Sequence, residues 1–116
     1  KHQLIYDYPQ ALMRAGRNRE ASDFIESELA RAPGDGQLHL IAARAYAAQN
    51  RELKQYQHQG EYYAWQGNLK AAVVQFELAS KAKDTNFYDA SVVDTRLQDL
   101  KKELKDQPKE TLKNQG

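Results

Sequence analysis

Apolar side chains recur along this chain at the three- and four-residue steps of amphipathic helices, in six segments separated by turn-forming residues. The last segment shows the step clearly, with Val93, Leu97, Leu100 and Leu104 in register. The pattern predicts helices at 3–15, 19–32, 37–49, 52–66, 69–83 and about 88–105. No segment alternates with period two, so we expect no strands.

The turn-forming residues themselves are regularly spaced, with one every seventeen positions: Gly16, Pro33, Asn50, Gly67 and Asp84. Each interval holds one helix of about four turns and a short connection. Seventeen is half the period of the tetratricopeptide repeat (TPR), a helix-turn-helix unit that stacks into a solenoid. The sequence therefore predicts an all-α, TPR-like solenoid of about six antiparallel helices with a C-terminal capping helix.

Residues 53–84 resemble the TPR consensus most closely. The matching positions are Tyr56, Gly60, Tyr63, Gly67, Ala72, Phe76 and Ala79. Small residues at helix crossings permit close contact, and aromatic side chains fill the space between helices. Gly16 and Gly67 both match the glycine within a repeat, yet they lie one and a half repeats apart. We therefore expect the helix at 52–66 to close one repeat and open the next.

Length and composition set the limits of this domain. The 116 residues suit one repeat domain at 1–105, with about 2.5 repeats plus the cap helix, and a polar tail at 106–116. Lysine and arginine nearly balance aspartate and glutamate, leaving a net charge of +1, so we expect no nucleic-acid partner. No apolar run is long enough for a membrane span. The chain has no Met at its start, and its first residue falls at the beginning of a predicted helix, so we expect a longer parent protein.

Residues that could carry chemistry are sparse. The chain has no Cys, no HExxH and no GxSxG motif. His2, His39 and His58 are too dispersed in the sequence for a helical metal pair, and His39 suits a buried, hydrogen-bonded position. We expect no catalytic residue, metal site or cofactor in this chain.

The end of the chain carries a second resemblance. The strings YYAWQGNLKAAVVQFELASK and FYDASVVDTRLQDLKKEL look like the C-terminal region of bacterial periplasmic TPR-containing zinc metalloproteases, the β-barrel-assembly-enhancing proteases. The similar elements are the turn from Tyr63 to Leu69 and the final helix around Asp94, Arg96 and Lys101. The resemblance implies a periplasmic location and a role in outer-membrane protein assembly and quality control. It also implies a parent enzyme whose HExxH domain and zinc lie upstream, and protein partners among β-barrel clients or the assembly machinery.

A solenoid of paired helices presents a curved surface to other polypeptides, so we expect a non-catalytic protein-interaction domain. In TPR stacks the first helix of each pair lines the groove. The predicted groove residues are Tyr6, Gln10, Arg14, Leu40, Arg44, Gln57, Glu61 and Trp65. Trp65 is the most suggestive of them, because aromatic and arginine side chains are enriched in binding hot spots. The alternative for Trp65 is packing against a neighbouring helix.

Two other functions remain open. A TPR adaptor of unrelated parentage would clamp acidic C-termini with basic groove residues, yet of Tyr6, Gln10, Ile41, Lys54 and His58 only Lys54 is of the required type. The array could instead dock on the protease domain of its own parent as a regulatory or structural element. An unpaired first helix would expose Leu4, Ile5 and Leu12, and such an apolar surface predicts a dimer of this chain.

Overall fold

The computed structural model describes residues 2–108, and this part of the chain is entirely helical between its turns. Six helices follow one another: α1 (His2–Arg14), α2 (Asn18–Arg31), α3 (Gly36–Ala48), α4 (Glu52–Trp65), α5 (Leu69–Ser80) and α6 (Phe87–Lys105). The predicted all-α array is confirmed, and its boundaries agree closely with the sequence pattern. The largest difference is at α5, which ends at Ser80 rather than at residue 83.

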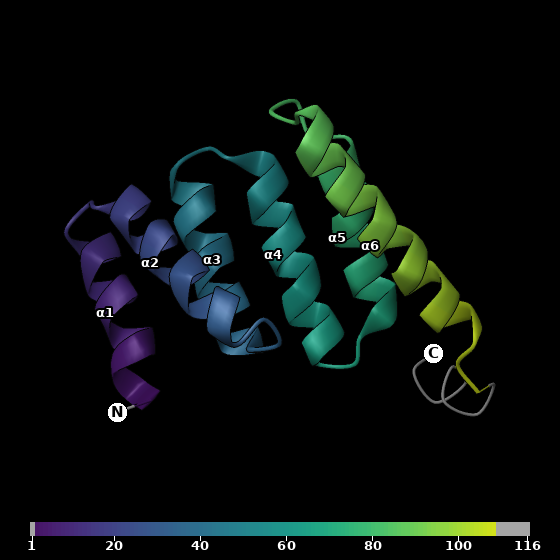
Figure 1. Cartoon of the computed structure of the whole chain (residues 1–116), viewed down its shortest axis with the longest axis horizontal. Helices are drawn as coiled ribbons and strands as arrows, with labels where there is room; N and C mark the ends of the chain where they lie inside the picture. The colour runs from purple at the N-terminus through teal and green to yellow at the C-terminus, as the bar shows by residue number, and fades with distance from the viewer. Residues whose placement is uncertain (1, 109–116) are drawn as a thin grey trace.

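The helices lie in sequence order across the long axis of the molecule, from α1 at one end to α6 at the other (Figure 1). Each helix packs against the next, and α1 also contacts α3. Short connections force such neighbours to run antiparallel. The result is an elongated array of 46 × 34 × 24 Å.

Turn residues end and begin these helices at the predicted spacing. Gly16 and Gly67 have φ values of +78° and +81°, a region that suits glycine, and Asn50 also has a positive φ of 56°. The side chain of Asp35 caps α3 by accepting a hydrogen bond from the Leu38 amide at 3.2 Å. Asn68 caps α5 in the same way. Local backbone chemistry therefore sets the seventeen-residue spacing.

The core consists of two apolar clusters, one in each half of the array. The first joins α1, α2 and α3 through Leu12, Ala21, Ile25, Leu29, Leu38, Ile41, Ala42, Ala45 and Tyr46. The second joins the last three helices through Leu53, Ala72, Val73, Phe76, Ala79, Ala82, Val93, Leu97 and Leu100. Helix α4 packs extensively on both α3 and α5, as expected of a helix that closes one unit and opens the next.

The first helix differs from the prediction in how it is covered. Leu12 was expected at the surface but is only 5% exposed, because α1 packs against α2 and α3 together. Ile5 is half-buried against the same cluster. Leu4 and Tyr8 stay exposed, at 68% and 50%. The apolar surface of α1 is therefore smaller than the sequence suggested.

Helix α6 ends at Lys105, and residues 106–108 continue without regular helix. Most of the predicted polar tail, 109–116, lies outside the described residues. Among the six described helices, none combines the length and apolarity that crossing a membrane requires.

Candidate functional site

Five of the eight predicted groove residues line two surface cavities. The larger cavity, of about 270 Å³, lies between α1 and α3. Its lining includes three predicted groove residues, Gln10, Arg14 and Arg44, together with Met13 and Ile41. Neither arginine forms an ion pair within residues 2–108. This cavity thus combines an apolar floor with two guanidinium groups available to a partner.

The smaller cavity, of about 190 Å³, lies where the α2–α3 connection meets α4 and α6. It is lined by Pro33, Gly34, His39, Glu61, Ala64, Trp65, Leu69, Arg96 and Glu103. Two predicted groove residues, Glu61 and Trp65, belong to this set. The sequence placed all eight groove residues along one surface, whereas these two cavities have no lining residue in common.

Glu61 is already engaged within the fold. Arg96 donates hydrogen bonds of 2.9 Å from Nε and from Nη2 to its two carboxylate oxygens. The hydrogen bond to Glu61 raises the pKa of Arg96, against the opposing effect of burial. Arg96 thereby anchors α6 to α4. Glu61 therefore holds α6 against α4, and both of its carboxylate oxygens are already bound by Arg96.

Tyr6 also has a structural partner. Its hydroxyl donates a 2.8 Å hydrogen bond to the Asp35 carboxylate, which is the same group that caps α3. That hydrogen bond raises the pKa of Tyr6. Gln10 in turn donates to the Tyr6 carbonyl at 3.0 Å. Tyr6 thus fixes α1 to the beginning of α3 and leaves Gln10 beside the larger cavity.

Trp65 packs against a neighbouring helix, which is one of the two alternatives that the sequence left open. It is 55% exposed, yet its ring lies directly against Gly36, where a side chain would collide with it. The Tyr62 ring is 6.1 Å away on the same helix. Leu40 and Gln57 are half-buried and line neither cavity, and the Gln57 side-chain oxygen is buried without a hydrogen-bond partner.

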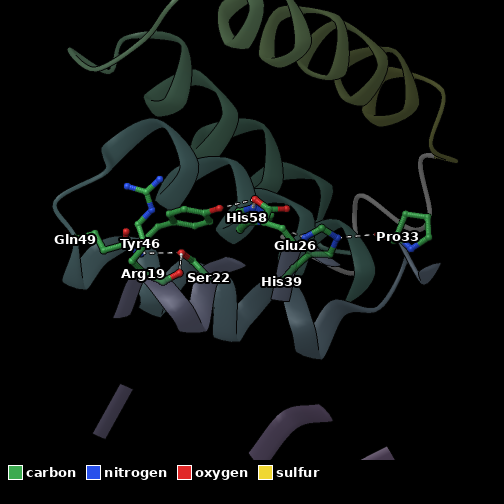
Figure 2. Close-up of polar contacts among 8 residues, drawn as sticks. All are labelled: Arg19, Ser22, Glu26, Pro33, His39, Tyr46, Gln49 and His58. Atoms are coloured by element: carbon green, nitrogen blue, oxygen red, sulfur yellow. Dashed lines mark hydrogen bonds and ion pairs between the residues drawn. The ribbon is translucent and has the colours of Figure 1, made fainter. Parts of the chain in front are cut away.

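Two histidines that the sequence separates meet in the interior (Figure 2). Nδ1 of His39 on α3 lies 2.9 Å from Nδ1 of His58 on α4. The outer nitrogen of His39 lies 2.8 Å from the Pro33 carbonyl oxygen, and that of His58 lies 3.3 Å from Glu26 Oε2. The expected buried, hydrogen-bonded His39 is confirmed. The two histidines are 19 positions apart in the sequence and meet because α3 and α4 are neighbouring helices.

The same network continues through Tyr46, whose hydroxyl donates a 2.5 Å hydrogen bond to Glu26 Oε2. Burial opposes the ionisation of Glu26, but the contacts with His58 and Tyr46 outweigh it and lower the pKa of Glu26 from 4.5 to about 2. Burial and the hydrogen bond to Glu26 raise the pKa of Tyr46. Burial lowers the pKa of His39, although the Pro33 carbonyl acts in the opposite direction.

Within residues 2–108, no group of three or more His, Asp or Glu side chains has an arrangement that could hold a metal ion. The buried histidine pair is occupied by hydrogen bonds at each of its four ring nitrogens.

No model of a known protein family matches this chain, and a search of curated protein sequences finds no significant relative. The fold therefore defines the class of this protein only as an all-helical array of antiparallel neighbours. The two cavities described above are the basis for the functional argument that follows.

Proposed function

We propose that this chain is a non-catalytic protein-interaction domain that binds a partner segment in the cavity between α1 and α3. The observation that carries the proposal is the meeting of Gln10, Arg14 and Arg44 at one cavity. These residues come from two helices and were selected by repeat register alone. Helical arrays bind other polypeptides along such inter-helix surfaces.

The lining of this cavity favours a particular partner chemistry. Met13 and Ile41 offer an apolar contact, and Arg14 and Arg44 offer planar groups that match a carboxylate. A partner segment with an acidic residue beside an aliphatic one satisfies both. Methionine adapts its shape to different side chains, which suits a surface that accepts more than one client sequence.

The biological setting that we propose follows from the sequence resemblance. We propose that the domain lies in the periplasm, within a TPR-containing zinc metalloprotease whose catalytic domain and zinc lie upstream. The partners would then be outer-membrane β-barrel clients or their assembly machinery. Support for this setting comes from the resemblance of residues 62–81 and of α6 to that family. This resemblance is independent of the cavity argument.

An internal partner is the second candidate. Leu4 and Tyr8 expose apolar surface on α1, at the end of the array. A further domain of the same parent protein, or a second copy of this chain, would bury that surface. This arrangement would make the array a regulatory or structural element.

A peptide titration tests the proposed binding chemistry. We would label a short peptide of alternating leucine and aspartate, and a matched peptide with asparagine in place of aspartate, and follow fluorescence anisotropy. We expect micromolar binding of the acidic peptide only, weakened about tenfold or more in the Arg14→Ala/Arg44→Ala double variant. The control is Arg19→Ala, which removes an arginine on α2 whose side chain is 79% exposed. Equal binding of both peptides, or an unchanged affinity in the double variant, would refute the proposed cavity.

Photo-crosslinking in cells then separates the two candidate functions. A photoreactive residue at position 44 reports on the larger cavity, and one at position 4 reports on the exposed end of α1. Adducts at position 44 with outer-membrane barrels or their assembly machinery support client binding. Adducts only with the parent's own upstream domain, or with a second copy through position 4, support the internal role instead.

A further inference from the structure

The His39–His58 pair has a hydrogen-bond arrangement that fixes the number of its protons. The Pro33 carbonyl only accepts hydrogen bonds, so His39 Nε2 carries a hydrogen. The ionised Glu26 carboxylate also only accepts, so His58 Nε2 carries another. Between the two Nδ1 atoms, 2.9 Å apart, one hydrogen must lie for a bond to form. The two rings together therefore hold three hydrogens on nitrogen, whereas two neutral imidazoles hold two.

The surroundings compensate the resulting positive charge. Both histidines are buried, at 9% and 6% exposure, and the Glu26 carboxylate lies against the outer edge of His58. The Tyr46 ring stacks on His58 at 5.4 Å and its hydroxyl donates to the same carboxylate. An imidazolium beside a carboxylate makes the stronger, charge-assisted class of hydrogen bond.

Other charged groups lie near this pair on α4, on α6 and just before α4. Glu61 on α4 adds negative potential at His39 and is itself bound by Arg96 of α6. Lys54, also on α4, carries a positive charge that helps to lower the pKa of Glu26. Arg51 lies over the Tyr46 ring at 4.9 Å. Among the described residues, Glu26 is the charged group that contacts a histidine ring nitrogen directly.

We infer that His39 and His58 form one buried proton-binding site that holds a single excess proton, and that this proton couples the stability of the α2–α3–α4 unit to pH. Losing the proton removes one of three hydrogen bonds: the one between the rings, the one to Glu26 or the one to the Pro33 carbonyl. Gaining a second one would place two N–H groups face to face across 2.9 Å. Either change weakens hydrogen bonds that join three helices. His39 and Pro33 also line the smaller cavity, together with Trp65.

The proton count can be measured directly by NMR of the histidine ring nitrogens. At about pH 6, near the ordinary value for histidine, we expect three protonated nitrogens across His39 and His58. Two or four protonated nitrogens would overturn the inference. The third histidine, His2, is assigned by its loss in a His2→Gln variant.

A pH titration tests the coupling. The folded pair uses the excess proton in hydrogen bonds that the unfolded chain lacks, so removing it destabilises the folded state. Between about pH 6 and pH 9 we expect one ring N–H signal to disappear and the urea midpoint to fall over the same range. A midpoint that stays constant while the proton leaves, or a proton that remains bound at the upper limit, would contradict the coupling.

Glu26→Gln provides the sharpest variant. A glutamine amide at this position can donate to His58 Nε2, so a neutral pair keeps every hydrogen bond. We expect two ring N–H groups in this variant and a flat urea midpoint at alkaline pH. The control is Glu77→Gln, which removes an exposed carboxylate on α5 and should retain the wild-type count. A Glu26→Gln protein with three ring N–H groups would refute the inference. If this variant fails to fold, the number of ring N–H groups in the wild-type protein tests the inference.

Discussion

Arg96 of α6 donates two hydrogen bonds of 2.9 Å to Glu61 of α4, although α5 separates these helices in the sequence. The two side chains are 34% and 23% exposed, so water screens this pair less than an ordinary surface ion pair. The contact joins the last helix to one that it does not follow. It therefore limits how far α6 can rotate away from the rest of the array.

Replacing Arg96 with alanine should lower the free energy of unfolding by about 1 kcal/mol, at the upper end for partly exposed pairs. Arg96→Lys should recover only part of this loss, since lysine cannot make the two-pronged contact. Urea unfolding measures both. The matched control is Lys101→Ala, because the Lys101–Glu77 pair is 3.6 Å long and 46% exposed on each side. Equal losses in the two alanine variants would contradict a special role for Arg96.

Gly60→Ala should destabilise the array, although alanine is the better helix former by about 1 kcal/mol. A Cβ atom at Gly60 would collide with the ring of Phe76, which is fully buried. Overpacking of this kind costs about 1–3 kcal/mol, so the collision should outweigh the gain in propensity. Gly34→Ala serves as the control, because nothing lies within 4 Å of a Cβ there. A stabilised Gly60→Ala protein would show that α4 and α5 can separate at little cost.

Most of the fold could be predicted from the sequence because its signals are local. Periodic apolar positions mark the helices, and Gly16, Asn50 and Gly67 mark turns through backbone conformations that they adopt readily. The coverage of α1 was missed because it depends on how α1 sits across two neighbours. Leu12 is buried through α3 as well as α2, and sequence spacing alone does not report that second contact.

The polar sites were harder to predict, since they join residues from different helices. His39 lies eleven positions before Asn50 and His58 lies eight positions after it. Antiparallel pairing of two helices about that turn would therefore have predicted that the two histidines are close. The involvement of Glu26 and the Pro33 carbonyl could not be foreseen, because it depends on side-chain directions from α2. Gln10, Arg14 and Arg44, which repeat register selected, line one cavity between α1 and α3.

Gly36→Ala should displace Trp65 while leaving the core intact. The new methyl group would overlap the indole ring, and that ring is 55% exposed and free to move toward solvent. Because Trp65 is the single tryptophan of the chain, its fluorescence reports the change directly. We expect emission at longer wavelength and a melting temperature close to that of the wild type. Gly34→Ala, two residues earlier, should leave the emission unchanged, and an unaltered spectrum in Gly36→Ala would contradict the packing of Trp65 on α3.

Acid should destabilise the array through two groups of the buried network. The folded-state pKa values of His39 and Glu26 both lie below their ordinary values, so the unfolded chain binds more protons in acid. Stability should therefore fall as the pH drops below about 6.5 and continue falling toward pH 2.

The part due to Glu26 is fully present above about pH 4.5 and is lost as the pH approaches 2, where its carboxylate takes up a proton. A shift of this size corresponds to about 3 kcal/mol, and solvent screening of a side chain that is 38% exposed reduces it to about 1–2 kcal/mol. Chemical denaturation at a series of pH values measures the slope. Glu26→Gln should flatten the curve below about pH 4.5, whereas Glu77→Gln should not, because Glu77 is paired only with an exposed lysine on the surface. An identical acid slope in wild type and Glu26→Gln would mean that Glu26 does not carry this dependence.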